Sequence, residues 1–236
     1  MKFKQCLPSL VTLGNIAFGF LGILAAADGH FQRACVLLFC GALCDLFDGR
    51  LARLLRATTQ FGAELDSLSD MVTFGLAPAV LVYFAVLRPL GAVGVAAVVA
   101  FALAAAVRLA RYNVDESPLA DLTFHGVPTP IAAGYLLSCV LVREQISKWT
   151  VLTIVVGISL TMLSTLKVPK FRKGNLPGLL LYPVIAAFVG LLVHPSALTW
   201  HLWNGWNLAL VAMNYAFLAR RTAVGSEDED KLRLAA

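Results

Sequence analysis

Charged residues are scarce in this sequence: Asp, Glu, Lys and Arg make up 14% of its 236 residues, whereas soluble proteins carry about 25%. Hydrophobic residues make up 59%, and the mean hydropathy is +0.78. These values argue against a soluble globular protein, and they exclude a disordered chain and a collagen-like fibre, because neither carries so much apolar material. The five cysteines include no CxxC pair, which argues against a disulfide framework and a zinc site.

The chain also lacks linkers, low-complexity segments and repeats, and apolar runs fill most of it. A bilayer-spanning helix needs about 20 residues, so we predict an all-α fold, a polytopic membrane bundle of about eight transmembrane helices. The predicted spans are Pro8–Ala27, Phe31–Leu55, Leu65–Leu87, Leu90–Asn113, Pro128–Val142, Trp149–Val168, Pro177–Val193 and Leu198–Ala219. The first run is also similar to a cleavable signal peptide, but it is long enough to span, and we expect a retained helix. Residues 1–221 then form one membrane domain, and residues 222–236 form a polar C-terminal tail.

Lys and Arg are distributed unevenly between the predicted loops. If the N-terminus lies in the cytoplasm, most of the 19 Lys and Arg residues fall on the cytoplasmic side, as is typical of membrane proteins. We therefore attribute the net charge of +5 to this bias and expect no nucleic-acid partner. The expected location is the cell (inner or plasma) membrane.

Four aspartates lie in or beside the second and third apolar runs, where a charge is costly and usually marks function or a buried pair. Asp45 and Asp48 are three residues apart, and Asp66 and Asp70 are four apart, so each pair shares one face of its helix. A short polar turn at 57–60 makes the two helices antiparallel neighbours. The four carboxylates then converge at the cytoplasmic surface, where divalent cations would relieve their repulsion. Oxygen ligands favour Mg²⁺, Mn²⁺ or Ca²⁺ over zinc.

Small and basic residues accompany these aspartates. Gly49 and Gly62 would let a bulky ligand approach the backbone, although close helix packing explains either glycine alone equally well. Arg53 lies one position off the aspartate face. It could reach a phosphate, or it could extend along the helix to the membrane surface.

The segment from Asp45 to Asp70 resembles the motif of the CDP-alcohol phosphotransferase family. The motif reads Asp-x2-Asp-Gly-x2-Ala-Arg-x8-Gly-x3-Asp-x3-Asp, and every fixed position is present. The resemblance implies an enzyme in which an alcohol attacks a CDP-activated phosphate and releases CMP. It implies that two divalent ions, Mg²⁺ or Mn²⁺, bind Asp45, Asp48, Asp66 and Asp70, and that Asp70 is also the base that activates the alcohol. It implies a CDP site lined by Gly49, Ala52, Arg53 and Gly62.

Flanking stretches resemble the branch of this family that transfers to serine. They are the segments 108–113, 124–130 and 163–169. Asp66 is followed by Ser-Leu-Ser-Asp-Met, unlike the Pro-x-Ala-Asp-Lys of phosphatidylglycerophosphate synthases. Eight spans, a six-helix catalytic core plus two, also fit this branch. The resemblance implies CDP-diacylglycerol and L-serine as substrates in a lipid membrane, and phosphatidylserine and CMP as products. We also expect a homodimer.

Two further sets of residues are candidates for substrate binding. Relatives open the first helix with Leu-Pro-Asn, whereas this chain has Ser9, a shorter partner for the nucleotide. Thr12 and Asn15 keep the expected spacing for the CDP site, although polar helix residues also form intrahelical hydrogen bonds. The carboxylate of serine needs a cation, and most basic residues here follow the positive-inside bias. The candidates nearest helical depth are Arg108, Arg111 and Lys167.

Alternatives remain open at this point. The same chemistry could use another acceptor, such as glycerol phosphate, inositol phosphate or choline. An ion-coupled transporter also carries intramembrane acids, but it would spread them across the bilayer midplane rather than gather them at one end. A structural membrane scaffold leaves the aspartates unexplained.

Overall fold

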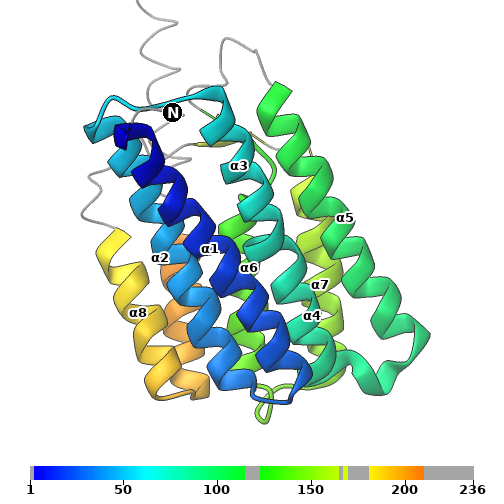
Figure 1. The fold of residues 1–236 in the computed structure, drawn as a ribbon. Coiled ribbons are helices and arrows are strands. Elements are labelled where there is room, and N and C mark those ends of the chain that lie inside the picture. Colours follow the sequence, from blue (N-terminus) through cyan, green and yellow to red (C-terminus); the bar gives the residue numbers. More distant parts are fainter. Residues whose placement is uncertain (1–2, 115–122, 165–166, 170–180, 210–236) are drawn as a thin grey trace, which may run out of the picture.

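The computed structural model describes residues 3–114, 123–164, 167–169 and 181–209, and helices dominate them (Figure 1). The helices are α1 (Phe3–Ala27), α2 (Phe31–Leu54), α3 (Gln60–Asp70), α4 (Ala77–Val82), α5 (Ala92–Val114), α6 (Thr129–Leu141), α7 (Lys148–Leu163) and α8 (Leu181–Val193). Helix α3 continues into α4 through the π-helical segment η1 (Met71–Leu76). The rod then extends through a second π-helical segment, η2 (Tyr83–Leu87), and the 3-10 turn η3 (Arg88–Leu90). A further helix covers 197–209.

The helices form a bundle in which successive long elements run in opposite directions (Figure 1). The most extensive contact between two helices is that of α1 with α2, and α1 also packs against α3, η1 and α4. Glycines allow this close approach: a Cβ at Gly22 would come within 2.8 Å of Leu38, and one at Gly41 within 2.9 Å of Thr73. Such small-residue contacts are typical of helices that pack in membranes.

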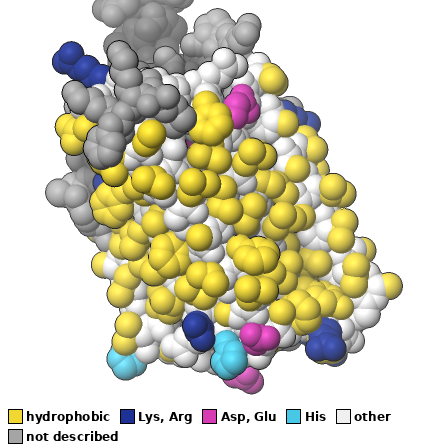
Figure 2. Space-filling view, in the orientation of Figure 1, with side chains coloured by type: hydrophobic (Ala, Val, Ile, Leu, Met, Phe, Trp, Pro, Cys, Tyr) yellow, Lys and Arg dark blue, Asp and Glu magenta, His cyan; other side chains and the backbone are white. Residues whose placement is uncertain are grey.

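The face of the bundle shown in Figure 2 is apolar over its middle, with charged side chains toward its ends. Outward leucines such as Leu10, Leu103 and Leu160 are 61%, 61% and 64% exposed, which suits contact with lipid tails rather than water. Three helical segments are long and apolar enough to cross a bilayer: Cys6–Ala27, Gln60–Leu90 and Ala92–Val114. The helical architecture of a membrane protein, predicted from the sequence, is thus confirmed.

Each predicted apolar run contains a helix, and several boundaries differ. The first helix begins at Phe3, so Pro8 lies inside it, in its second turn, where it has no backbone N–H to donate to the preceding turn. The third begins at Gln60 rather than Leu65, because the hydroxyl of Thr59 caps it by accepting a hydrogen bond from the Gly62 amide at 3.0 Å. Residues 177–180 and 210–219 of the last two predicted spans, and the tail 222–236, lie outside the described residues.

The sixth predicted helix, Trp149–Val168, is wrong at its C-terminal end. It stops at Leu163, and Lys167–Pro169 forms strand β2, which pairs antiparallel with β1 (Thr123–His125). Pro169 disfavours helix in the residue before it, and pairing with β1 satisfies the extended backbone instead. The strands join the connection that follows α5 to the connection that follows α7. The sequence predicts no strands, so this pair of three-residue strands is an addition to a fold whose described residues are otherwise helical, as expected.

Candidate active site

The helices α2 and α3 both pack against α1, and this arrangement brings three of the predicted metal ligands together. Carboxylate oxygens of Asp45, Asp48 and Asp66 all lie within 4.8 Å of one another. Asp48 is buried, and the other two are half-buried. This arrangement follows from the helical period, which places the aspartates of each helix on one face.

Asp70 lies outside that group of three but beside Asp45, close enough for the two carboxyl groups to interact. Its Oδ1 atom and Oδ2 of Asp48 are buried and have no hydrogen-bond donor among the described residues. A buried carboxylate oxygen without a donor is unfavourable. A hard divalent cation, which prefers oxygen ligands, would remove that penalty. The residues present therefore fit a metal site.

The two glycines of the motif do not serve close helix packing. No atom of the described residues lies within 4 Å of a Cβ built at Gly49. A Cβ at Gly62 would meet only the Oγ1 atom of Thr59, its own helix cap, at 3.2 Å. Close helix packing therefore does not explain these two glycines among the described residues. Ala52 is half-buried and Arg53 is exposed on the next turn of α2.

Thr12 and Asn15, the two candidate residues of α1, differ in their hydrogen bonds. Thr12 is 5% exposed, and its hydroxyl donates to the Pro8 carbonyl at 3.1 Å and also interacts with the Asp48 carboxylate. Asn15 is fully buried, and neither polar atom of its side chain has a partner among the described residues. Its backbone carbonyl accepts a hydrogen bond from Thr73 at 3.0 Å. Asn15 therefore has an unused amide in the interior, beside Gly41, which lies one helical turn before Asp45 on α2.

The three basic residues considered for the serine carboxylate have different surroundings in the structure. Arg108 is 6% exposed, its Nη1 atom donates to the hydroxyl of Thr129, and its charge interacts with that of Asp70. Arg111 is exposed, and its Nη1 atom donates to the Leu163 carbonyl at 2.8 Å. It thus caps the C-terminus of α7, a structural role. Lys167 lies in β2 opposite His125, and nothing is described of its side chain.

Sequence reasoning missed three residues that hydrogen-bond beside the site. Thr129, at the start of α6, accepts the hydrogen bond from Arg108. Ser67 and Asn113 are joined by a hydrogen bond of 2.9 Å from the Asn113 amide, which fixes the end of α5 beside Asp66. All three residues lie in stretches that carry the family resemblance, and that was the available signal.

Comparison with known proteins agrees with this geometry. The family model described as CDP-alcohol phosphatidyltransferase matches residues 5–163. A CDP-diacylglycerol–serine O-phosphatidyltransferase of Helicobacter pylori is 34% identical over 70% of this chain and 73% of its own. One from Bacillus subtilis is 34% identical over 71% of this chain and 92% of its own. An archaetidylserine synthase of Methanothermobacter thermautotrophicus is 32% identical over 70% of each chain. The chain belongs to the CDP-alcohol phosphatidyltransferase family.

Proposed function

We propose that the protein transfers the phosphatidyl group of CDP-diacylglycerol to L-serine, which gives phosphatidylserine and CMP. One observation carries the proposal: the carboxylates of Asp45, Asp48 and Asp66 meet within 4.8 Å in a chain whose relatives from Helicobacter pylori and Bacillus subtilis carry that enzyme name. A transporter or a scaffold does not require this cluster at one end of the bundle, with open space at Gly49. The family membership favours the enzyme over both.

Two divalent ions, Mg²⁺ or Mn²⁺, are part of the proposal, with Asp45, Asp48, Asp66 and Asp70 as their ligands. The buried oxygens of Asp48 and Asp70 that lack donors support it. When bound, the ions neutralise the diphosphate and the departing CMP, which is the main requirement of phosphoryl transfer. Asp70, whose carboxyl group interacts with that of Asp45, is the fourth proposed ligand.

Asp70 is proposed to accept the proton of the serine hydroxyl as that oxygen attacks the phosphorus bound to diacylglycerol. The new bond joins the serine oxygen to this phosphorus, and the bond between phosphorus and the bridging oxygen of CMP breaks with its electron pair leaving on CMP. A carboxylate is suited to this work when it lies within reach of the hydroxyl. Its buried, unpaired Oδ1 atom supports this role.

The nucleotide is proposed to lie over the exposed face of α2. Gly49 and Gly62 leave space for it, and Arg53, which is exposed there, is placed to pair with a phosphate. Ala52, Thr12 and Asn15 complete the proposed CDP site. The unused amide of Asn15 supports a polar contact that the free protein does not make.

Arg108 is the proposed partner of the serine carboxylate. A carboxylate close to four aspartates would be repelled, so a cation must offset that repulsion. Arg108 meets this need because it is buried and its charge interacts with that of Asp70, the residue proposed to meet the serine hydroxyl. Arg111 is engaged with α7. Lys167 stays a candidate, brought to the same end of the bundle by the strand pair.

Several architectural expectations belong to the same proposal: eight membrane-spanning helices, one membrane domain over 1–221, a homodimer, and an active site that faces the cytoplasm. The arginines Arg50 and Arg53 on the α2 end that carries the aspartates support the cytoplasmic side. Light scattering of the detergent-solubilised protein tests the dimer. Labelling of single cysteines from either side of sealed vesicles tests the side and the number of spans.

Product identification tests the reaction. Purified protein receives CDP-diacylglycerol, Mn²⁺ and isotope-labelled serine together with unlabelled glycerol phosphate, inositol phosphate and choline, and the lipids are analysed by mass spectrometry. We expect labelled phosphatidylserine as the product. A lipid that carries one of the other headgroups, with none that carries serine, would establish the alternative acceptor instead.

A further inference from the structure

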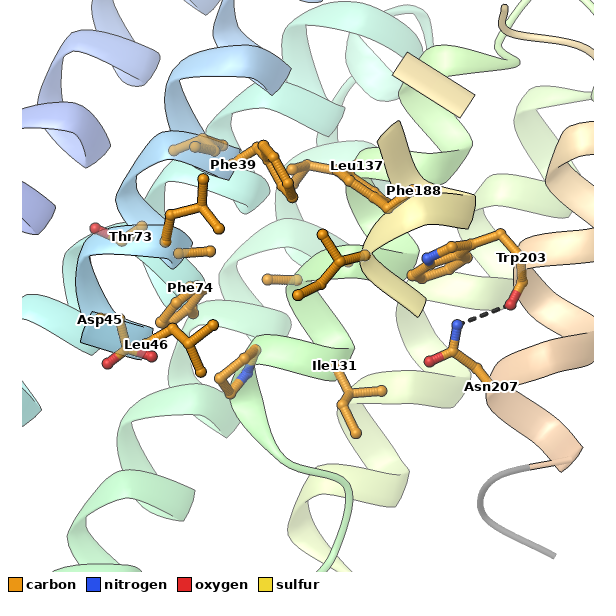
Figure 3. A pocket seen from close by; sticks show the side chains of 17 residues that line it. Phe39, Asp45, Leu46, Thr73, Phe74, Ile131, Leu137, Phe188, Trp203 and Asn207 are labelled. Atoms are coloured by element: carbon orange, nitrogen blue, oxygen red, sulfur yellow. Dashed lines mark hydrogen bonds between the residues drawn. The ribbon is translucent and has the colours of Figure 1, made fainter. Parts of the chain in front are cut away.

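A cavity of about 240 Å³ lies beside the aspartates, between α2, η1, α6, α8 and the 197–209 helix (Figure 3). Most of its lining is apolar, including Leu46, Phe74, Ile131 and Leu137. An apolar cavity of roughly 150 Å³ already stays dry and admits a hydrocarbon such as benzene. The nature of this lining therefore selects a hydrocarbon group rather than a nucleotide, a phosphate or an amino acid.

The cavity adjoins the proposed reaction centre. Asp45 belongs both to its lining and to the group of three carboxylates. From there the lining follows α6 from Pro130 to Leu137, a length of about 10 Å at the rise of an α-helix. The hydrocarbon of one bilayer leaflet is about 15 Å thick. The cavity thus covers a large part of the depth that a lipid chain occupies, starting at the carboxylates.

Two helices beyond the segment that the family model matches complete the wall of the cavity. The family model ends at residue 163, whereas Phe188 of α8 and Trp203 of the 197–209 helix line the cavity. Trp203 is 3% exposed, and its ring would lie 3.1 Å from a Cβ built at Gly134. Its ring centroid is 5.1 Å from that of Tyr135 and 5.6 Å from that of Phe188. Because aromatic contacts on two sides hold Trp203, it forms a fixed wall rather than a movable one.

We propose that this cavity binds one unbranched hydrocarbon chain of the lipid donor, and that Trp203 makes the site selective for straight over branched chains. The proposal rests on the proposed function, because the occupant is a chain of CDP-diacylglycerol. Methyl branches widen a chain, and the ring of Trp203 cannot withdraw without losing its contacts with Gly134, Tyr135 and Phe188. The enzyme therefore takes a diacyl donor with straight chains in preference to one with branched isoprenoid-like chains.

Chain selectivity is measured as CMP release from three donors in the same detergent: CDP-dioctanoylglycerol, CDP-dipalmitoylglycerol and CDP-diphytanoylglycerol. We expect kcat/KM for the dipalmitoyl donor to exceed that for the diphytanoyl donor by at least about tenfold, since a single extra methyl group in a packed pocket has an effect of that size. Trp203→Ala should reduce this ratio to near one by admitting the branches. Leu202→Ala is the matched control, because Leu202 lies on the same helix and is 60% exposed, and it should keep the wild-type ratio.

A second variant changes the cavity in the opposite direction. Ala133 is 3% exposed and lines the cavity, so Ala133→Leu fills part of it. This change should lower kcat/KM for the dipalmitoyl donor more than for the dioctanoyl donor. Equal ratios between donors in wild type, Trp203→Ala and Ala133→Leu would overturn the chain site while the reaction itself stands. An absence of CMP release from every donor in the folded wild type would instead contradict the proposed function.

Discussion

Replacement of Asp48 by Asn should have opposite effects on the metal-free and the metal-loaded protein. Without metal, the carboxylates of Asp45, Asp48 and Asp66 repel one another at separations of up to 4.8 Å. Each such pair interacts with about 3 kcal/mol at an effective dielectric constant of about 20. Asp45 and Asp66 are half-buried, so solvent reduces this value. We expect Asp48→Asn to stabilise the metal-free protein by about 1–2 kcal/mol.

The metal-loaded protein should instead lose stability in Asp48→Asn, because Asn supplies a neutral ligand in place of a charged one. Loss of a hydrogen-bond partner that only orients a ligand already lowers metal affinity by about 10- to 100-fold, and loss of a ligand charge should lower it by at least the larger factor. Thermal unfolding in detergent, first in EDTA and then along a Mn²⁺ titration, measures both effects. Glu64→Gln, an exposed carboxylate on the same helix as Asp66, is the control and should change neither. A lower unfolding temperature of Asp48→Asn in EDTA, or an unchanged response to Mn²⁺, would refute the reasoning.

Other substitutions test individual contacts. Arg108→Ala should raise the KM for serine about 10- to 100-fold, the effect of a lost hydrogen bond to a charged group, and leave the KM for the lipid donor nearly unchanged; equal changes in both constants would contradict it. Arg111→Ala should instead lower the unfolding temperature, because this side chain caps α7, and kinetics should show no selective loss for serine. Gly41→Leu should destabilise the bundle by about 1–3 kcal/mol in thermal unfolding, because a Cβ there already meets Thr73 at 2.9 Å. Gly49→Ala should stabilise the protein by up to about 1 kcal/mol, because alanine is favoured over glycine inside a helix, and should raise the KM for the donor; unchanged kinetics would remove Gly49 from the nucleotide site.

The sequence predicts those parts of the site that depend on a local repeat. Asp45 and Asp48, and likewise Asp66 and Asp70, share helix faces because of the helical period, and a short turn makes the two helices neighbours. The structure confirms the convergence of Asp45, Asp48 and Asp66. The period alone does not say how far along α3 the partner helix reaches, and this is why Asp70 lies beside the group rather than within it.

Features that depend on contacts between distant segments were not predictable in this way. Arg108 and Arg111 are three residues apart and chemically identical, and only the packing of α6 and α7 shows that Arg108 bonds Thr129 while Arg111 caps a helix. The pairing of Thr123–His125 with Lys167–Pro169 joins two connections far apart in the chain. The apolar cavity likewise depends on the contact of Trp203 with Gly134, which no local pattern encodes.

The most direct test of the central claim is CMP release by the purified protein from CDP-diacylglycerol, with one acceptor alcohol at a time. The account predicts release with L-serine in Mn²⁺ or Mg²⁺, loss of release in EDTA and recovery when the cation is restored. It predicts no comparable release with glycerol phosphate, inositol phosphate or choline. Full activity in EDTA would contradict the role of the four aspartates, and release with another acceptor but not with serine would contradict the assigned reaction.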